Sequence, residues 1–237
     1  MKNTAIVLLV IALLAAVPFA SAAVTPPRTL TAGTSEHRDL GALADQNVSA
    51  QGGNVTQVNI NVLAITKAWQ GYYGNITGEI TLDDADNNTF YNWSLAAPKG
   101  EVYATRNAAV DFSTIGCANA TERTAEETYL GQVLADGDSV TNTFNGTTHP
   151  QFNVSTTSVA VNTCFSTNAF VNSAQDASRF FQVLLADGAS VIVYTTLIDN
   201  DQTGFDGNGY DFELLVGEND HDGSVGSTLY YFFVELT

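Results

Sequence analysis

The chain has 237 residues and a formal net charge of −17 at pH 7, with only 8 lysine and arginine residues against 25 aspartate and glutamate residues. This balance excludes nucleic acid as a partner, because nucleic acid is bound through basic side chains that release counterions, and it also argues against anionic lipid surfaces. The length suits one large all-β domain or two small ones.

Residues 1–22 have the layout of a secretory signal peptide. Lys2 gives a basic start, an apolar run covers 5–16, and small residues at 20–22 suit a signal peptidase. The apolar run is shorter than the roughly 20 residues that a membrane helix needs. We predict cleavage after Ala22 and an extracellular or cell-surface protein without a stable membrane anchor. A retained N-terminal helix, as in type IV pilins, is the alternative.

Residues 23–53 are rich in Thr, Ala and Gly, with Pro26-Pro27 near the start and no aromatic side chain. This composition predicts an extended N-terminal arm ahead of the folded domain. We expect the arm to join one copy of the chain to the next instead of packing on its own domain. A disordered leader is the alternative.

From Asn54 onward the sequence has the pattern of a β-domain, 54–237. Val58, Ile60 and Val62 alternate with polar residues, which predicts a first strand with one buried face. Apolar runs separated by acidic or glycine turns then recur at 80–95, 129–144, 180–197 and 210–236. Asp136-Gly137 and Asp187-Gly188 are expected at hairpin turns. Helix signals are scarce: Thr124 begins a capping pattern for a short helix through residue 130, and Ser173 to Arg179 could form another turn or two.

Many short strands spaced by turns predict an all-β fold, a single large antiparallel β-sandwich of immunoglobulin-like or jelly-roll-like type. Two stacked sandwiches are the alternative. The last apolar run, TLYYFFVEL at 228–236, is apolar on both faces. It therefore needs cover on both sides, as a central strand has, or it becomes an aggregation hazard.

The cysteines and the glycosylation sequons both indicate export. Cys117 and Cys164 are the only cysteines, and an even pair in an exported chain predicts a disulfide. Its loop closure would stabilise the fold by roughly 4 kcal/mol. The chain has eight glycosylation sequons, and all of them precede residue 156. We therefore predict a glycoprotein whose C-terminal third carries no N-linked glycan. The sequon asparagines are Asn47, Asn54, Asn75, Asn87, Asn92, Asn119, Asn145 and Asn153.

The stretch LIDNDQTGFDGNGYD at 197–211 is the strongest candidate for an ion site. Its carboxylates at Asp199, Asp201, Asp206 and Asp211 are the hard oxygen ligands that calcium prefers. The twelfth position of an EF-hand loop is here a tyrosine, so any calcium site would be of another type. Asp, Asn and Gly are also the residues that make turns, and a solvated turn is the competing interpretation.

Six aromatic residues are concentrated within 35 residues and could form a sugar-binding platform. Strands also use aromatic rings for core packing, which is the alternative. The six residues are Trp69, Tyr72, Tyr73, Tyr91, Trp93 and Tyr103. Acidic turns at Asp83-Asp84-Asp86 and at Asp220-His221-Asp222 are expected to be solvated hairpin tips. No nucleophile elbow, phosphate loop, dinucleotide fingerprint or paired-cysteine zinc pattern occurs. We therefore expect no enzyme and no certain cofactor.

The blocks NVTQVNINVLAITKAWQGYYGNITGEITL and FYNWSLAAPKGEVYAT, within 54–105, resemble a recurring pattern in uncharacterised secreted archaeal surface proteins. The closing FELLVGEND and LYYFFVELT are similar to the ends of those chains. The resemblance implies an exported archaeal glycoprotein with no established activity. More loosely, the signal peptide, β-sandwich pattern and N-terminal arm look like archaeal pilus or thread subunits that polymerise by donor-strand exchange.

These observations lead to three hypotheses. The first is a non-catalytic structural subunit of an extracellular filament, pilus or surface coat, which forms a homopolymer. The second is a calcium-dependent carbohydrate-binding module of lectin or adhesin type, which recognises surface glycans. The third is a glycan hydrolase, since two distant carboxylates are all that such chemistry needs.

Overall fold

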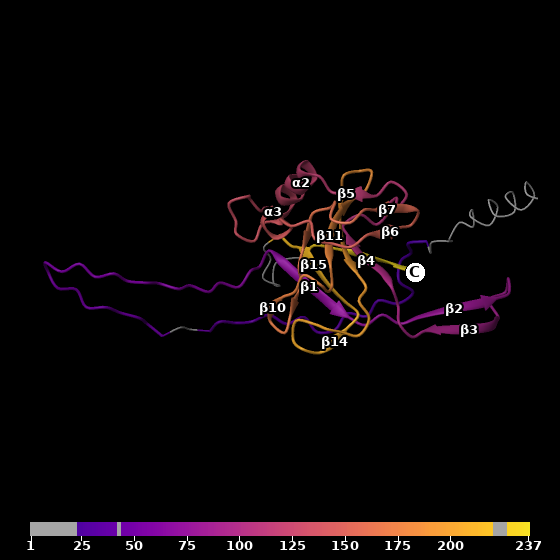
Figure 1. Cartoon of the computed structure of the whole chain (residues 1–237), viewed down its shortest axis with the longest axis horizontal. Helices are drawn as coiled ribbons and strands as arrows, with labels where there is room; N and C mark the ends of the chain where they lie inside the picture. Colours follow the sequence, from indigo (N-terminus) through magenta and orange to yellow (C-terminus); the bar gives the residue numbers. More distant parts are fainter. Residues whose placement is uncertain (1–22, 42–43, 220–226) are drawn as a thin grey trace, which may run out of the picture.

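The structure is a computed structural model that describes residues 23–41, 44–219 and 227–237 (Figure 1). The predicted signal peptide and the acidic turn at 220–222 lie outside the described residues. Strands dominate, their pairing is antiparallel, and only two short helices occur in the described part, so the predicted all-β class is confirmed. None of the helices within the described ranges has the length and apolar character needed to cross a membrane.

One antiparallel sheet forms the centre of the fold. Its strand order is β16 (Tyr231–Leu236), β4 (Gly100–Thr105), β12 (Ile192–Leu197), β11 (Gln182–Ala186) and β5 (Gly116–Cys117), and β8 (Ser166–Thr167) also pairs with β11. The three middle strands are buried almost throughout. Burial on both faces explains why apolar side chains in these strands follow one another, as in Val183–Ala186 and Ile192–Tyr194, and do not alternate with exposed polar ones.

Both faces of this sheet are covered, by different kinds of structure. On one face lie β1 (Trp69–Gly74), paired with β15 (Phe212–Gly217), and the helices α2 (Ala120–Leu130) and α3 (Val140–Thr143). Leu130, Phe144 and Leu214 reach into the core there. On the other face lies the hairpin of β6 (Phe152–Val154) and β7 (Thr157–Val159), which packs in a second core around Tyr103, Leu185 and Phe233.

Three further hairpins complete the described strands: β2 (Gly78–Asp83) with β3 (Thr89–Leu95), β9 (Phe170–Val171) with β10 (Ala174–Gln175), and β13 (Gln202–Thr203) with β14 (Gly209–Tyr210). The second stacked layer thus contains only β1 and β15. The described residues therefore show a central sheet covered on both faces, and they do not show the single large sandwich that we expected.

Two of the four predicted hairpins are confirmed. β11 and β12 pair directly and are joined through Asp187, whose carboxylate accepts from the backbone N–H groups of Ala189 and Val191, both at 2.9 Å. β2 and β3 also pair as expected. The hairpin expected at 129–144 is wrong, because this segment holds the end of α2 and then α3. The one expected at 210–236 is also wrong, since β15 pairs with β1 and β16 pairs with β4.

Helix α2 begins earlier than the capping pattern at Thr124 predicts. Asn119 is its N-cap and accepts from the N–H groups of Thr121 and Glu122, while the carboxylate of Glu122 accepts from the N–H of Asn119. This is a capping box, which satisfies the free amides of the first turn. A partly buried ion pair between Arg106, which follows β4, and Glu126 then links the helix to the sheet.

The last strand is an edge strand, contrary to the central position that its apolar sequence suggested. β16 pairs with β4 on one side, and among the described residues only Thr25 pairs with it on the other side. Thr25 and Val234 exchange two backbone hydrogen bonds, of 3.0 and 2.8 Å. The start of the N-terminal arm therefore does pack on its own domain, and it covers part of the edge that β16 would otherwise expose.

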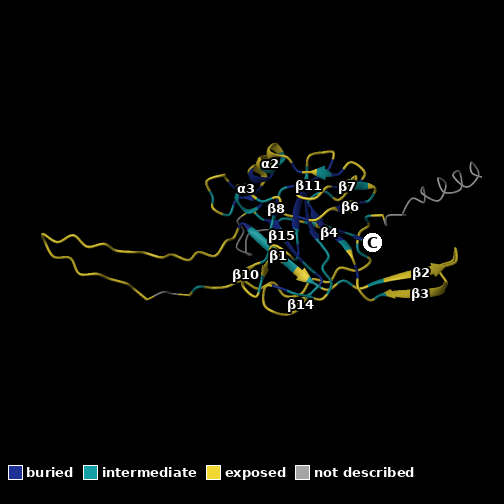
Figure 2. Ribbon diagram, in the orientation of Figure 1, coloured by how far each residue is buried: buried dark blue, intermediate teal, exposed yellow. Residues whose placement is uncertain are grey.

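The alternating segment at 54–66 does not form the predicted first strand. It is extended, exposed and paired with no strand among the described residues, and the first regular strand is β1. Together with residues 44–53 it makes a long loop that leaves the body and returns (Figure 1). We call residues 44–66 the extended loop. The β2–β3 hairpin projects from the opposite end of the body (Figures 1 and 2).

Candidate functional site

The extended loop exposes apolar side chains that could be buried only by another surface. It turns at Gln51–Asn54, where Gly53 has a φ of +88°, a conformation that glycine adopts without strain. On the returning leg, Val58, Ile60 and Val62 are 54%, 82% and 81% exposed. Residues 54–66 contain no charged side chain. Such a segment has the composition of a strand, yet no strand in the described part of the chain pairs with it.

The returning leg is fixed to the body at its end. The hydroxyl of Thr66 donates to a carboxylate oxygen of Asp138 at 2.5 Å, and the indole N–H of Trp69 donates to the Asp138 carbonyl at 2.6 Å. These contacts hold the beginning of β1 beside the loop that follows α2. The extended loop is therefore anchored where it rejoins the domain, while its middle projects.

The β2–β3 hairpin has one apolar and one polar face. Ile80 stands opposite Trp93 and Leu82 stands opposite Tyr91, and directly opposed residues share a face of the sheet. These four side chains, which we call the apolar hairpin face, are each between 50% and 57% exposed. The Tyr91 and Trp93 ring centroids are 4.8 Å apart. A two-stranded hairpin of this kind is marginal by itself and gains stability when a third strand or a partner covers it.

The opposite face of the hairpin is polar where the two strands pair regularly, and Phe90, which is 83% exposed, lies at the register shift next to the tip. Glu79 stands opposite Ser94 and Thr81 stands opposite Asn92. The amide of Asn92 donates to Glu79 at 3.3 Å, and Arg28 of the N-terminal arm forms an exposed ion pair with the same carboxylate at 2.9 Å. Because Asn92 is a sequon residue, a glycan there would extend from the polar face and leave the apolar face free.

An open groove of about 1180 Å³ lies between β1, β15, the 167–170 segment and residues 35–40 of the arm. Rings of Tyr72, Tyr73 and Phe205 line part of it. Tyr73 contacts Phe205 with centroids 5.0 Å apart and Tyr210 with centroids 4.7 Å apart. Of the six aromatic residues singled out in the sequence, Tyr73 is thus exposed beside a groove, whereas Tyr103 is fully buried and Trp69 packs on Phe144.

The structure does not bring the four candidate calcium ligands together. Asp211 is buried and its two oxygens accept from the N–H groups of Ile76 and Asp201, at 2.7 and 2.9 Å. Asp206 accepts from the backbone N–H of Asn208, a hydrogen bond that lowers the pKa of its carboxyl. Burial raises the pKa of the Asp199 carboxyl. No group of three or more potential ligands converges within the described residues, so the geometry favours the turn interpretation.

The acidic turn at 83–86 forms the tip of the β2–β3 hairpin. Asp84 accepts from the backbone N–H groups of Asp86 and Asn88, at 2.9 and 2.8 Å. Hydrogen bonds from Asn88 lower the pKa of Asp84. Its carboxylate therefore closes a turn, as the sequence predicted for a solvated hairpin tip.

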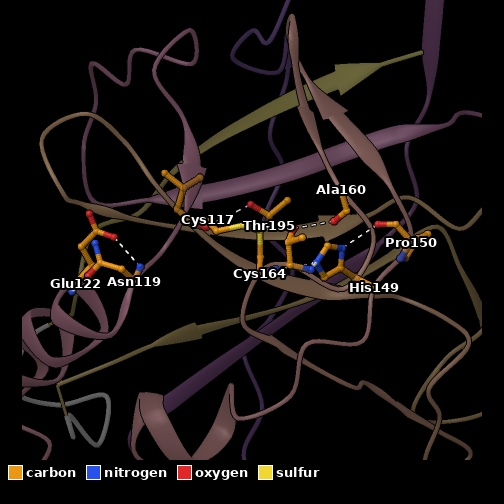
Figure 3. Close-up of a disulfide and its surroundings, with 10 residues drawn as sticks. Cys117, Asn119, Glu122, His149, Pro150, Ala160, Cys164 and Thr195 are labelled. Carbon is orange, nitrogen blue, oxygen red and sulfur yellow. Dashed lines mark hydrogen bonds between the residues drawn. A yellow bond between two sulfur atoms is a disulfide. The ribbon is translucent and has the colours of Figure 1, made fainter.

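The predicted disulfide is present. Cys117 of β5 and Cys164 are bonded, with their Cα atoms 4.9 Å apart (Figure 3). The buried ring of His149 lies next to it, and its Nε2 accepts from the N–H groups of Thr163 and Cys164 at 3.1 and 3.0 Å. The other ring nitrogen lies 2.8 Å from the Pro150 carbonyl, so Nδ1 is the protonated one. His149 is thus a structural histidine that supports the disulfide, a role that the sequence did not reveal.

A second feature that the sequence did not reveal is a pair of buried carboxyl groups. Glu101 on β4 and Glu235 on β16 are direct cross-strand neighbours, 5% and 0% exposed. Paired carboxyls are the usual apparatus of glycan hydrolysis. Here both lie within the second core, and neither lines the open groove.

All eight sequon asparagines are exposed. They lie on the extended loop, on the hairpin and on the body, so glycans could be attached without disturbing either core. No protein family, no curated protein and no solved structure shows significant similarity to this chain.

Proposed function

We propose that the protein is a non-catalytic subunit of an extracellular filament or surface coat, assembled from copies of this chain. The observation that carries the proposal is the extended loop, whose strand-like residues 54–66 are exposed and without a strand partner in the described chain. Large exposed apolar surfaces on a soluble chain mark sites of association. The second projection, the β2–β3 hairpin, provides another such surface.

Three further observations support an extracellular setting. The disulfide is typical of chains that fold in an oxidising compartment. All sequon asparagines are accessible, and the N-terminal residues have the layout of a signal peptide. The strongly negative charge favours solubility of the single subunit until specific contacts form.

The experiment that tests the proposal is negative-stain microscopy of material shed from cells that secrete the chain, combined with light scattering of the purified protein. Regular polymers containing this chain are expected, with an average mass that rises with protein concentration. A monodisperse monomer at every concentration and salt condition would contradict the proposal.

The groove beside β1 favours a second candidate, carbohydrate binding. Exposed rings stack against sugar faces, and Tyr73, Phe205 and Tyr210 form such a cluster next to polar side chains of Gln182 and Glu213. Titration of the chain with surface polysaccharide, with and without millimolar calcium, tests it. Binding should be lost in Tyr73→Ala and kept in the control Tyr91→Ala, which removes an equally exposed ring at a distant place. Loss in both variants, or in neither, would count against this groove.

A further inference from the structure

We propose that residues 58–64 of one copy add as a third strand to the outer edge of β3 in the next copy. The added strand would continue the apolar hairpin face with its own side chains. This inference rests on the proposed function, because it names the two surfaces through which subunits would join.

The two surfaces match in length and pattern. The segment 58–64 has seven residues, as β3 does. Extended chain places Val58, Ile60 and Val62 on one side and the polar Asn59 and Asn61 on the other. Added to the hairpin in register, the apolar side would continue the surface formed by Tyr91 and Trp93, while the asparagines would join the polar face.

Of the two edges of the hairpin, the outer edge of β3 is the better one for the addition of a strand. Each strand of this two-stranded sheet has one neighbour among the described residues. The arm already contacts the β2 strand through the Arg28–Glu79 ion pair. Strand addition uses main-chain hydrogen bonds for affinity, and the alternate side chains set the register.

The placement of the two surfaces makes the contact intermolecular. The extended loop and the hairpin project from opposite ends of the body, so the segment does not reach the hairpin of its own chain (Figure 1, Figure 2). Two different surfaces that meet head to tail generate a ring or an open filament. Every added subunit presents a new extended loop at one end and a new hairpin at the other.

The uncharged side chains of the segment and of the apolar hairpin face also favour contact between these two surfaces. Each copy has a net charge of −17, so two copies repel one another over most of their surfaces. Residues 54–66 carry no charge, and the apolar hairpin face consists of uncharged side chains. The hairpin itself has four acidic residues and no basic one between residues 78 and 95. An uncharged segment adds no further repulsion to it, and added salt should promote assembly by screening the remaining charges.

The test compares two double variants of the secreted chain. Val58→Asn with Ile60→Asn makes the apolar side of the segment polar without adding charge, and Asn59→Ser with Asn61→Ser changes its polar side, also without adding charge. All four side chains are exposed, so the body of the fold is untouched. We expect the first variant to reduce polymer at least about tenfold at equal concentration, and the control to stay within about twofold of wild type. Equal loss in both variants, or none in the first, would overturn the inference.

A complementation experiment tests the direction of the contact. A hairpin variant, Tyr91→Asp with Trp93→Asp, keeps its extended loop, and the segment variant keeps its hairpin. Neither should polymerise alone, but an equimolar mixture should give 1:1 dimers by light scattering. A mixture that stays monomeric would overturn the inference. Wild type that never polymerises would instead refute the proposed function, so the two failures are distinguishable.

Discussion

Glu101 and Glu235 face one another across β4 and β16 with both carboxyl groups buried. Tyr103 donates its hydroxyl to one Glu235 oxygen at 3.3 Å, and the backbone N–H of Ser155 donates to the same oxygen at 2.8 Å. One oxygen of Glu101 has no hydrogen-bond partner among the described residues. Burial, and then the neighbouring Glu235 charge, raise the pKa of Glu101 to about 8. Glu101 therefore keeps its proton in the folded state at neutral pH.

This pair makes stability depend on pH in an unusual direction. Because the folded-state pKa of Glu101 exceeds its ordinary value of 4.5, its contribution to stability is complete below about pH 4.5 and is lost as the pH rises to about 8. Each pH unit in this window can cost up to about 1.4 kcal/mol of unfolding free energy. Glu101→Gln cannot ionise, so it should unfold at a higher denaturant concentration than wild type at pH 8 and show a flatter profile between pH 5 and 8. Parallel profiles for the two proteins would contradict the assignment.

The buried Asp211 should be important for stability whether or not calcium is present. Asp211→Ala removes the acceptor for two backbone N–H groups and is expected to lower the unfolding free energy by about 1–3 kcal/mol. Asp206→Ala, at the exposed tip of the same loop, should change it by no more than about 0.5 kcal/mol. Denaturant titrations with millimolar calcium and with chelator measure both effects. A calcium-induced rise in Tm that Asp201→Ala abolishes would restore the ion-site interpretation.

Loss of the disulfide should destabilise the domain, because the unfolded chain would gain conformational freedom. Cys117→Ser with Cys164→Ser opens a loop with a sequence separation of 47 residues, at an expected cost of about 2–5 kcal/mol. Thermal unfolding of the variant, and of wild type under reducing conditions, should show matching losses. Intact-mass measurement of the native protein should find no free thiol, and two titratable thiols would refute the bridge.

The exposed sequons predict that the native protein is heavier than its sequence. Intact mass before and after enzymatic deglycosylation should differ by several glycans, and peptide mapping should place them before residue 156. Asn92→Gln should remove one glycan without changing assembly, because Asn92 lies on the polar face of the hairpin. An unmodified native mass would contradict the glycoprotein prediction.

Sequence patterns predicted those features that depend on neighbouring residues. The apolar runs of β11 and β12 and the turn at Asp187 gave a correct hairpin, and the two cysteines gave the correct bridge. The start of α2 could have been found too, because Asn119 and Glu122 have the spacing of a capping box. Asn119 is also a sequon residue, and the sequon pattern alone does not indicate the capping role.

Features that depend on pairing between segments far apart in the sequence could not be predicted. The alternation at 58–64 specifies a strand face but does not supply a partner for it, and within the described chain none pairs with it. Likewise, in the sequence Glu101 and Glu235 have the pattern of ordinary polar residues near strand ends. Only the register of β4 with β16 shows that they meet and are buried.

The hydrogen bonds between Thr25 and Val234 also constrain the order in which the protein can fold. The residue that closes the edge of the last strand lies near the start of the described chain, so the sheet cannot be completed until β16 has emerged and found β4. Contacts between such distant parts of a sequence form late and slowly. For the exported subunit proposed above, this order would keep the chain unfolded enough to pass a narrow channel and would complete the sheet only outside.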